Sequence, residues 1–285
     1  MDTQKPILSA LTENDPELAQ RLVDRRHAIK AGAAVSSAVA AGLRMASVPV
    51  ALAAVARDAF GQTRMPAVVV NVLNYALLLE EFETFFYTAA VNSGVIPAAD
   101  LPIFQRIRDN ETAHRNFLRT TLGASARPAP AFDPTGGKGR GNGPYADIFT
   151  NYQTFLAAAQ AFEDNGVRAY KGQAPALLPY KDVLTAALTI HSVEARHASE
   201  VRRLRHGFTD QEPFGQGWIT GAATNVPGPA AGVYVGEDNT THAGVNAATL
   251  TYTPAVAGIN QITEAFDEPL TQAQVVALVD PFIVG

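Results

Sequence analysis

The sequence predicts an all-α protein, built as a four-helix bundle with an irregular C-terminal extension that ends in a short helix. Three observations lead to this prediction. Four stretches carry apolar residues at the three- and four-residue spacing of one helix face. Their connections are short, long and short, which is typical of two antiparallel helix pairs joined by a crossover. The second pair also repeats the first at a constant offset, since Glu111 and Glu194, for example, are 83 positions apart.

The first helix pair is expected over residues 65–91 and 101–122, approximately. The first helix ends at the stretch NSGVIPAAD, and Asp100 with Pro102 is typical of a helix start, as a cap and a first-turn proline. One face of the first helix carries residues that recur at helical spacing, namely Leu73, Ala76, Glu80, Glu83 and Tyr87.

The second helix pair follows the long connection. Residues 123–144, GASARPAPAFDPTGGKGRGNGP, contain too much Gly and Pro for a regular element and are predicted to be the crossover. The third helix is expected over about 145–171. After a short break the fourth runs from 175 or 179 to 206, where Gly207 stops it. The bundle domain is thus predicted at residues 57–207.

Residues 208–285 form the predicted extension. From 213 to 262 the charged residues are Glu237 and Asp238 alone, so this segment would be poorly solvated by itself. We therefore expect an extended arm that packs on the bundle or on a neighbouring copy, which would make the protein a homo-oligomer through residues 208–285. A last short helix is expected after Thr271, its predicted cap.

Residues 1–56 are predicted to be a twin-arginine-type export signal. Arg25 and Arg26 begin a weakly apolar run rich in Ala and Val, which reaches triplets of small residues. An ordinary amphipathic helix is the alternative interpretation. Arg44 within the run argues against a membrane span, and no other segment is long and apolar enough for one. We expect an exported protein, periplasmic or at the cell surface, with no membrane span in the mature chain.

The composition restricts the classes of function. A net charge of -5 gives no general affinity for nucleic acid, which would require clustered Lys and Arg. Without cysteine the chain has no disulfide, thiolate nucleophile or iron–sulfur cluster. A bound metal must therefore be held by carboxylates, imidazoles or backbone oxygens.

Each half of the repeat contains one Glu-x-x-His sequence, in NETAHRNFL and in VEARHASEV, and another Glu 31 residues earlier. Residues three apart on a helix point the same way, so the Glu and His of each motif can bind one ion together. A Glu from each of two helices and Glu-x-x-His from each of the other two is the pattern of di-iron and di-manganese bundles. The sequence therefore predicts two metal ions and six ligands, which are Glu80, Glu111, His114, Glu163, Glu194 and His197.

Each Glu-x-x-His motif is expected to bind one of the two ions. Glu111 with His114 would serve one ion and Glu194 with His197 the other, while the two remaining glutamates complete or bridge the pair. One Glu-x-x-His alone is common on a solvated helix face. Here, however, apolar neighbours turn both motifs toward the core, where four carboxylates without a cation would repel one another and carry a desolvation cost.

Three further residues are candidates for supporting roles at this site. Tyr87 and Tyr170 lie two turns after the first Glu of each half and either pack in the core, which we favour, or hydrogen-bond to ligands or carry an electron. Glu83, whose repeat partner is Gly166, is an extra ligand, a proton relay or, as we favour, a group that accepts a hydrogen bond from a ligand.

At these residues the sequence resembles the ferritin-like superfamily, particularly exported ferritin-like domain proteins of the desiccation-related group. The stretches NYALLLEEFETFFY, NETAHRNFL, FEDNGVRAYKG, HSVEARHASEV and EAFDEPLTQAQVVALVDPF carry the resemblance. It implies a ferritin-like bundle with an iron or manganese centre that reacts with O2 or peroxide. We expect a ferroxidase- or catalase-like oxidoreductase, and no sequence feature chooses between these reactions and the oxidation of an organic substrate. The alternative is a structural or stress-protective surface protein, in which the metal only stabilises the bundle and the extension mediates assembly.

Overall fold

The structure is a computed structural model, and it describes residues 65–207, 217–222, 224–250 and 259–285. The export signal predicted at residues 1–56 lies outside the described residues and stays a prediction. Within the described part of the chain, no helix is long and apolar enough to cross a membrane.

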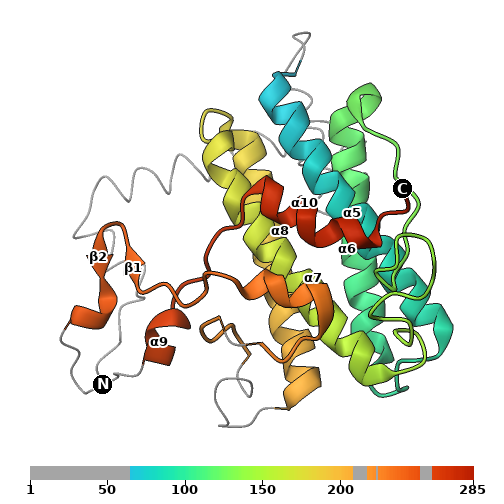
Figure 1. Ribbon diagram of the computed structural model, residues 1–285. Helices are drawn as coiled ribbons and strands as arrows, with labels where there is room; N and C mark the ends of the chain where they lie inside the picture. Colours follow the sequence, from blue (N-terminus) through green and yellow to red (C-terminus); the bar gives the residue numbers. More distant parts are fainter. Residues whose placement is uncertain (1–64, 208–216, 223, 251–258) are drawn as a thin grey trace, which may run out of the picture. The chain divides into compact units, whose positions relative to one another are not determined.

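Four long helices build the bundle: α5 (Ala67–Ser93), α6 (Leu101–Leu122), α7 (Tyr152–Gln173) and α8 (Lys181–His206) (Figure 1). Helix α5 packs along α6 and α7 along α8, and contacts between α5 and α7 join the two pairs. The predicted all-α four-helix bundle is confirmed, with the long connection between α6 and α7 as the crossover.

The helix ends differ from the prediction in two places. Asp100 precedes α6, but its carboxylate does not cap the helix; it accepts a hydrogen bond of 2.8 Å from the Tyr152 hydroxyl at the start of α7. Helix α7 begins at residue 152 rather than 145, because the Asn151 side chain accepts from two backbone N–H groups and caps it there. Both differences, the missing cap of α6 and the later start of α7, arise from side-chain contacts that helical periodicity does not predict.

The crossover is folded around one carboxylate. After η1 (Gly123–Ser125), Asp133 is buried and accepts hydrogen bonds from the Thr135 backbone and hydroxyl and from the N–H groups of Gly139 and Gly141. A Cβ on Gly143 would lie 2.2 Å from the Thr135 carbonyl oxygen, so the backbone approaches itself more closely there than any side chain allows.

The C-terminal extension consists of short elements, as expected. They are η3 (Gly228–Tyr234), the hairpin strands β1 (Thr241–His242) and β2 (Val245–Asn246), η4 (Ala247–Thr249), α9 (Ile259–Thr263), α10 (Gln272–Val279) and η5 (Asp280–Phe282). Thr271 caps α10 in a reciprocal capping box with Gln274, so the predicted final helix and its cap are confirmed. A further 3-10 turn, η2 (Ala174–Leu177), separates α7 from α8.

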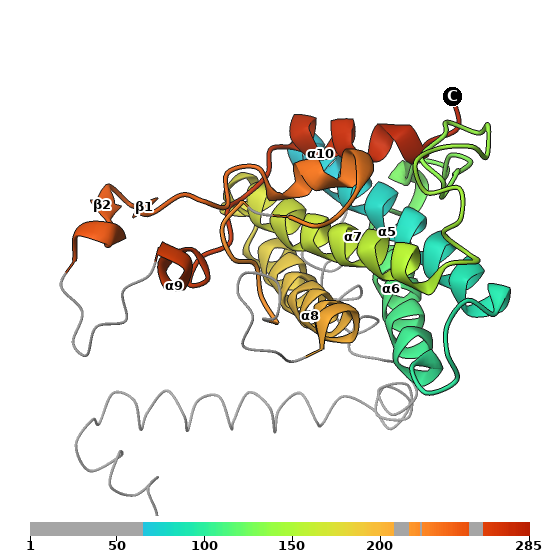
Figure 2. The ribbon, with the colours of Figure 1, turned by 60° about the horizontal axis from the view of Figure 1, so that its bottom comes forward.

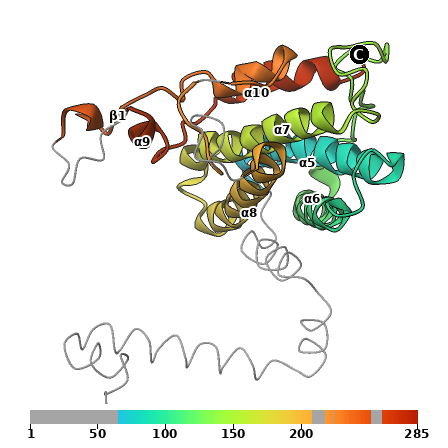
Figure 3. The ribbon, with the colours of Figure 1, turned by 90° about the horizontal axis from the view of Figure 1, so that it is seen from below.

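Arg168 on α7 holds the extension to the bundle. Its guanidinium is buried, donates to the carbonyl oxygens of Val233, Val235 and Glu268, and pairs with Glu237 at 2.7 Å. Figures 2 and 3 show α7 lying between α8 and the C-terminal segments. In the described residues, the extension thus packs on its own bundle, the first of the two arrangements that the sequence allowed.

The core of the bundle has two apolar ends of different composition. One end is rich in aromatic rings, including those of Phe86, Phe104 and Phe155. The other is largely aliphatic, with Leu73 and Ile190 among its members. Between the two ends lies a layer of buried charged side chains.

Candidate metal centre

The buried layer contains all six predicted ligands, delivered by four helices. Each helix places its acidic or imidazole groups on the inward face, because apolar residues one turn away on the same face are buried at the two ends of the core. The carboxylate residues are 0% exposed and the two histidines 6% exposed, for Glu80, Glu111, Glu163, Glu194, His114 and His197.

These side chains form two groups of four, the groups that could hold a metal ion within the described residues. The first contains Glu80, Glu111, His114 and Glu194, and the second contains Glu111, Glu163, Glu194 and His197. In each group one ligand atom from every residue lies within 4.8 Å of the others. Adding or subtracting the repeat offset converts one group into the other, so the symmetry of the sequence is also that of the site.

The sequence left open whether Glu80 and Glu163 would bridge the two ions, and the composition of the two groups bears on this question. Glu111 and Glu194 belong to both groups, whereas Glu80 stands only beside His114 and Glu163 only beside His197. The glutamates of the Glu-x-x-His motifs are therefore the central ones, and the earlier glutamate of each half lies at an outer position.

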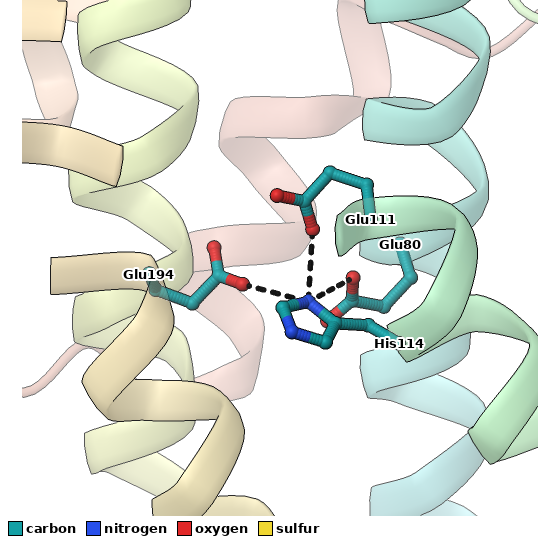
Figure 4. Close-up of side chains that lie close together, drawn as sticks. All are labelled: Glu80, Glu111, His114 and Glu194. Carbon is teal, nitrogen blue, oxygen red and sulfur yellow. Dashed lines mark hydrogen bonds and ion pairs between the residues drawn. The ribbon is translucent and has the colours of Figure 1, made fainter. Parts of the chain in front are cut away.

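The histidines present Nδ1 to the carboxylates. His114 Nδ1 lies 3.0 Å from Glu111, 3.2 Å from Glu194 and 3.4 Å from Glu80, and Figure 4 shows the three carboxylates converging on this nitrogen. His197 Nδ1 lies 2.7 Å from Glu111 and 3.3 Å from Glu163.

The two tyrosines hydrogen-bond to outer carboxylates, so core packing alone is the wrong interpretation of them. The Tyr87 hydroxyl donates to Glu163 and the Tyr170 hydroxyl donates to Glu80. Each tyrosine thus orients a carboxylate of the other half of the repeat, and all four residues are buried.

Burial and mutual repulsion shift the protonation equilibria of this layer. Burial raises the pKa of Glu80 to about 7 and raises the pKa of Glu163 and Glu194 as well, partly opposed by the histidines. At Glu111 hydrogen bonds from both imidazoles outweigh burial and lower the pKa. Burial alone would lower the pKa of His114, but the surrounding carboxylates raise it, as they do for His197.

The donor atoms fit a bound cation. Five of the six residues have a buried atom that makes no well-aligned hydrogen bond among the described residues: Glu80 Oε2, Glu111 Oε1, Glu163 Oε2, both oxygens of Glu194, and His197 Nδ1. Most of these atoms instead lie in ion-pair contacts between a histidine Nδ1 and a carboxylate, and Oε2 of Glu194 has no such contact. A buried acceptor without any partner, such as Oε2 of Glu194, costs about 1–3 kcal/mol, more if charged. A metal ion would supply a cationic partner to several of these atoms at once, in place of the protons that the layer otherwise takes up.

The two halves of the repeat differ at one pair of equivalent positions near the site, which carries Glu83 in the first half and Gly166 in the second. A Cβ at position 166 would lie 2.6 Å from Oε2 of Glu194, so the glycine leaves the space that this shared carboxylate occupies. Glu83, at the equivalent position on α5, is buried, and repulsion from the neighbouring carboxylates adds to burial in raising its pKa. It belongs to neither group of metal-competent atoms, so it is not placed as a seventh ligand.

Asn110 is a site residue that the sequence reasoning missed. Its side-chain amide lies 3.0 Å from Nε2 of His197, the nitrogen that faces away from the carboxylates. The atom at this distance is the amide nitrogen Nδ2, which can donate to Nε2 when Nδ1 carries the ring proton. An amide turned by 180° would instead accept the Nε2 proton and leave Nδ1 free to bind a cation. The repeat partner of Asn110 is Val193, so the repeat gives no signal for this contact.

Comparison with known proteins agrees with this geometry. The model of the family described as "Ferritin-like domain" matches residues 69–207, which run from the first turn of α5 to the end of α8. No curated protein matches the chain. Residues 69–207 therefore form a ferritin-like domain.

Proposed function

We propose that this protein binds two metal ions, iron or manganese, and acts as an oxidoreductase that reacts with O2 or peroxide. The observation that carries the proposal is the pair of symmetric four-residue groups that share Glu111 and Glu194. Two shared carboxylates would hold the ions close together and neutralise their charge, whereas a single structural ion would need only one group.

The residues divide into distinct roles. Glu80 and His114 would hold one ion, Glu163 and His197 the other, and the two central glutamates would bridge them. When bound, such ions supply electrons to an oxidant or take them from a substrate. The tyrosine hydroxyls fix the outer carboxylates, and the apolar ends of the core exclude water from the charged layer.

The choice of iron or manganese rests on donor chemistry. Carboxylate oxygens and imidazole nitrogens suit these metals, and the absence of cysteine removes the soft ligands that favour copper(I) or iron–sulfur clusters. Reaction with an oxidant, ferroxidase- or catalase-like, further requires an ion that changes its oxidation state.

Metal analysis of the purified protein tests the proposal, together with measured consumption of O2 and of peroxide. We expect about two ions per chain. Glu111→Ala or Glu194→Ala should reduce both, since each carboxylate serves both groups. Glu200→Ala is the matched control, because this half-buried glutamate on α8 pairs with Arg203 and belongs to neither group. Less than one ion per chain, unchanged in the two central variants, would contradict the proposal.

Metal without oxidant consumption would instead favour the alternative, a structural or stress-protective protein in which the ions only stabilise the bundle. We also propose export to the periplasm or cell surface, membership of the desiccation-related group, and homo-oligomer formation through residues 208–285. The sequence patterns support these three proposals. Fractionation of cells and light scattering of the full chain test the first and the third.

A further inference from the structure

A small cavity lies among the four helices at the aliphatic end of the core, next to the charged layer. Val72, Ala76, Leu118, Ala186 and Ile190 are among its lining residues, and Tyr170 forms the wall toward Glu80. Its volume is about 20 Å³. On this measure one water requires roughly 10–15 Å³, so the cavity has room for one very small molecule.

The walls of the cavity offer little to a polar guest. The hydroxyl groups of Thr121 and Tyr170 already donate, to the Phe117 carbonyl and to Glu80. The Tyr75 hydroxyl is buried without a hydrogen-bond partner among the described residues, and Gln173 lies at the half-buried rim. A buried water needs about two to four polar partners, and apolar cavities of proteins stay dry and take up apolar guests.

At the opposite end of the bundle, larger side chains occupy several of the equivalent positions. Adding or subtracting the repeat offset relates five residues of the cavity wall to larger ones, in the pairs Val72 and Phe155, Leu79 and Phe162, Ala169 and Phe86, Ala186 and Ile103, and Ala187 and Phe104. Five lining residues are instead larger than their partners, in the pairs Tyr75 and Ala158, Phe117 and Glu200, Leu118 and Val201, Gln173 and Ala90, and Leu177 and Gly94.

The aromatic rings at that end pack on one another and on Tyr87. The ring centroid of Phe155 lies 4.9 Å from that of Phe104 and 5.3 Å from that of Phe86, and Tyr87 lies 5.0 Å from Phe86. The side of the site that holds Glu163 therefore adjoins a packed cluster of rings, while the side that holds Glu80 adjoins the cavity. The two halves of the repeat thus carry equivalent ligands, but the side chains that surround the ligands differ between the Glu80 side and the Glu163 side.

We propose that this cavity binds O2 and delivers it to the Glu80 side of the site. An apolar diatomic molecule matches the size and the lining of the cavity, whereas peroxide would need several hydrogen-bond partners. The inference rests on the proposed function for the use made of O2. The binding of an apolar guest does not depend on it.

Xenon tests the cavity without metal or turnover, because it is an apolar atom that occupies dry cavities. In crystals of the full-length protein under xenon pressure, we expect one site beside Ala76 and Ala186, and none at the aromatic end. Ala186→Ile, which copies the side chain of Ile103, should remove the site. Phe155→Val, which copies Val72, should create a second site at the opposite end.

Steady-state kinetics of the metal-loaded protein, with O2 and with peroxide, test whether the guest of the cavity is O2. Ala186→Ile should raise KM for O2 by about tenfold, equivalent to 1.4 kcal/mol of lost binding, and leave the rate with peroxide within about twofold. Ala176→Ile is the control, because it makes the same change at an exposed position of η2.

The outcomes separate the two proposals. Absence of xenon from the cavity, or an unchanged KM for O2 in a folded Ala186→Ile variant, overturns the inference. Xenon binding in a protein that consumes neither oxidant overturns the proposed function and the O2 assignment, but not the existence of a site for an apolar guest.

Discussion

Replacement of Gly166 by alanine should weaken metal binding without destabilising the metal-free bundle. The new Cβ would lie 2.6 Å from Oε2 of Glu194, whereas ordinary contact begins at 3.4 Å, so the carboxylate must move by about 0.8 Å. Metal–ligand distances tolerate only about 0.2 Å. A displaced ligand of this kind reduces metal affinity by roughly 10- to 100-fold, the range measured for residues that orient ligands.

The same substitution should not destabilise the metal-free protein. Alanine in a helix interior is about 1 kcal/mol more favourable than glycine, and the clashing group is the mobile end of a side chain. We therefore expect an unchanged or slightly higher Tm in the presence of a chelator, together with weaker metal binding in a competition titration.

Gly172→Ala is the matched control for Gly166→Ala, in the same helix. Its Cβ would lie 1.9 Å from the backbone oxygen of Leu270, which cannot move aside as a carboxylate does, so we expect a loss of about 3 kcal/mol in stability. Metal affinity of Gly166→Ala within about twofold of the parent protein would refute the assignment of Glu194 as a ligand.

Three further predictions concern buried polar groups. Tyr170→Phe leaves a buried carboxylate without its donor, so we expect urea unfolding of the metal-free protein to show a loss of about 1–3 kcal/mol; no loss would contradict the contact. Arg168→Met leaves the buried Glu237 carboxylate without its cation and three carbonyl oxygens without their donor, and should cost about 3–5 kcal/mol. Adding Glu237→Gln should restore the part due to the unpaired charge; equal losses in the single and double variants would argue against the pair. Burial and two neighbouring arginines lower the pKa of His206 to about 4, below its usual 6.5, so the unfolded chain binds the proton first and stability falls as pH drops from 6.5 toward 4. His206→Gln should reduce that slope of Tm against pH, and an identical slope would contradict the shift.

The bundle and its six inward-facing side chains were predictable because they depend on periodicity along the chain. The repeat offset ties Glu80 to Glu163 and each Glu-x-x-His to the other, and buried faces follow from the apolar residues one turn away. The six side chains then come together in one layer when the two halves pack face to face, as they do in bundles of this topology.

Contacts between the halves were not predictable in the same way. Which carboxylates are shared, which tyrosine reaches which glutamate, and the position of Asn110 beside His197 all depend on side-chain rotamers across different helices. No spacing within one helix contains this information.

Arg168 illustrates a second limit of sequence reasoning. An arginine on a helix is usually exposed, yet this one is 1% exposed because the extension supplies three carbonyl acceptors and one carboxylate from residues far along the chain. The space beside Ala186 was equally hidden, since a cavity arises from the sum of many side-chain volumes.

Anomalous diffraction from crystals of the metal-loaded protein tests most directly whether the six side chains form a di-metal site. Data collected at the iron and manganese absorption edges should show two peaks in the buried layer, one between Glu80 and His114 and one between Glu163 and His197, with Glu111 and Glu194 between the peaks. A single peak, or none in this layer in a fully loaded protein, would contradict the two-ion site.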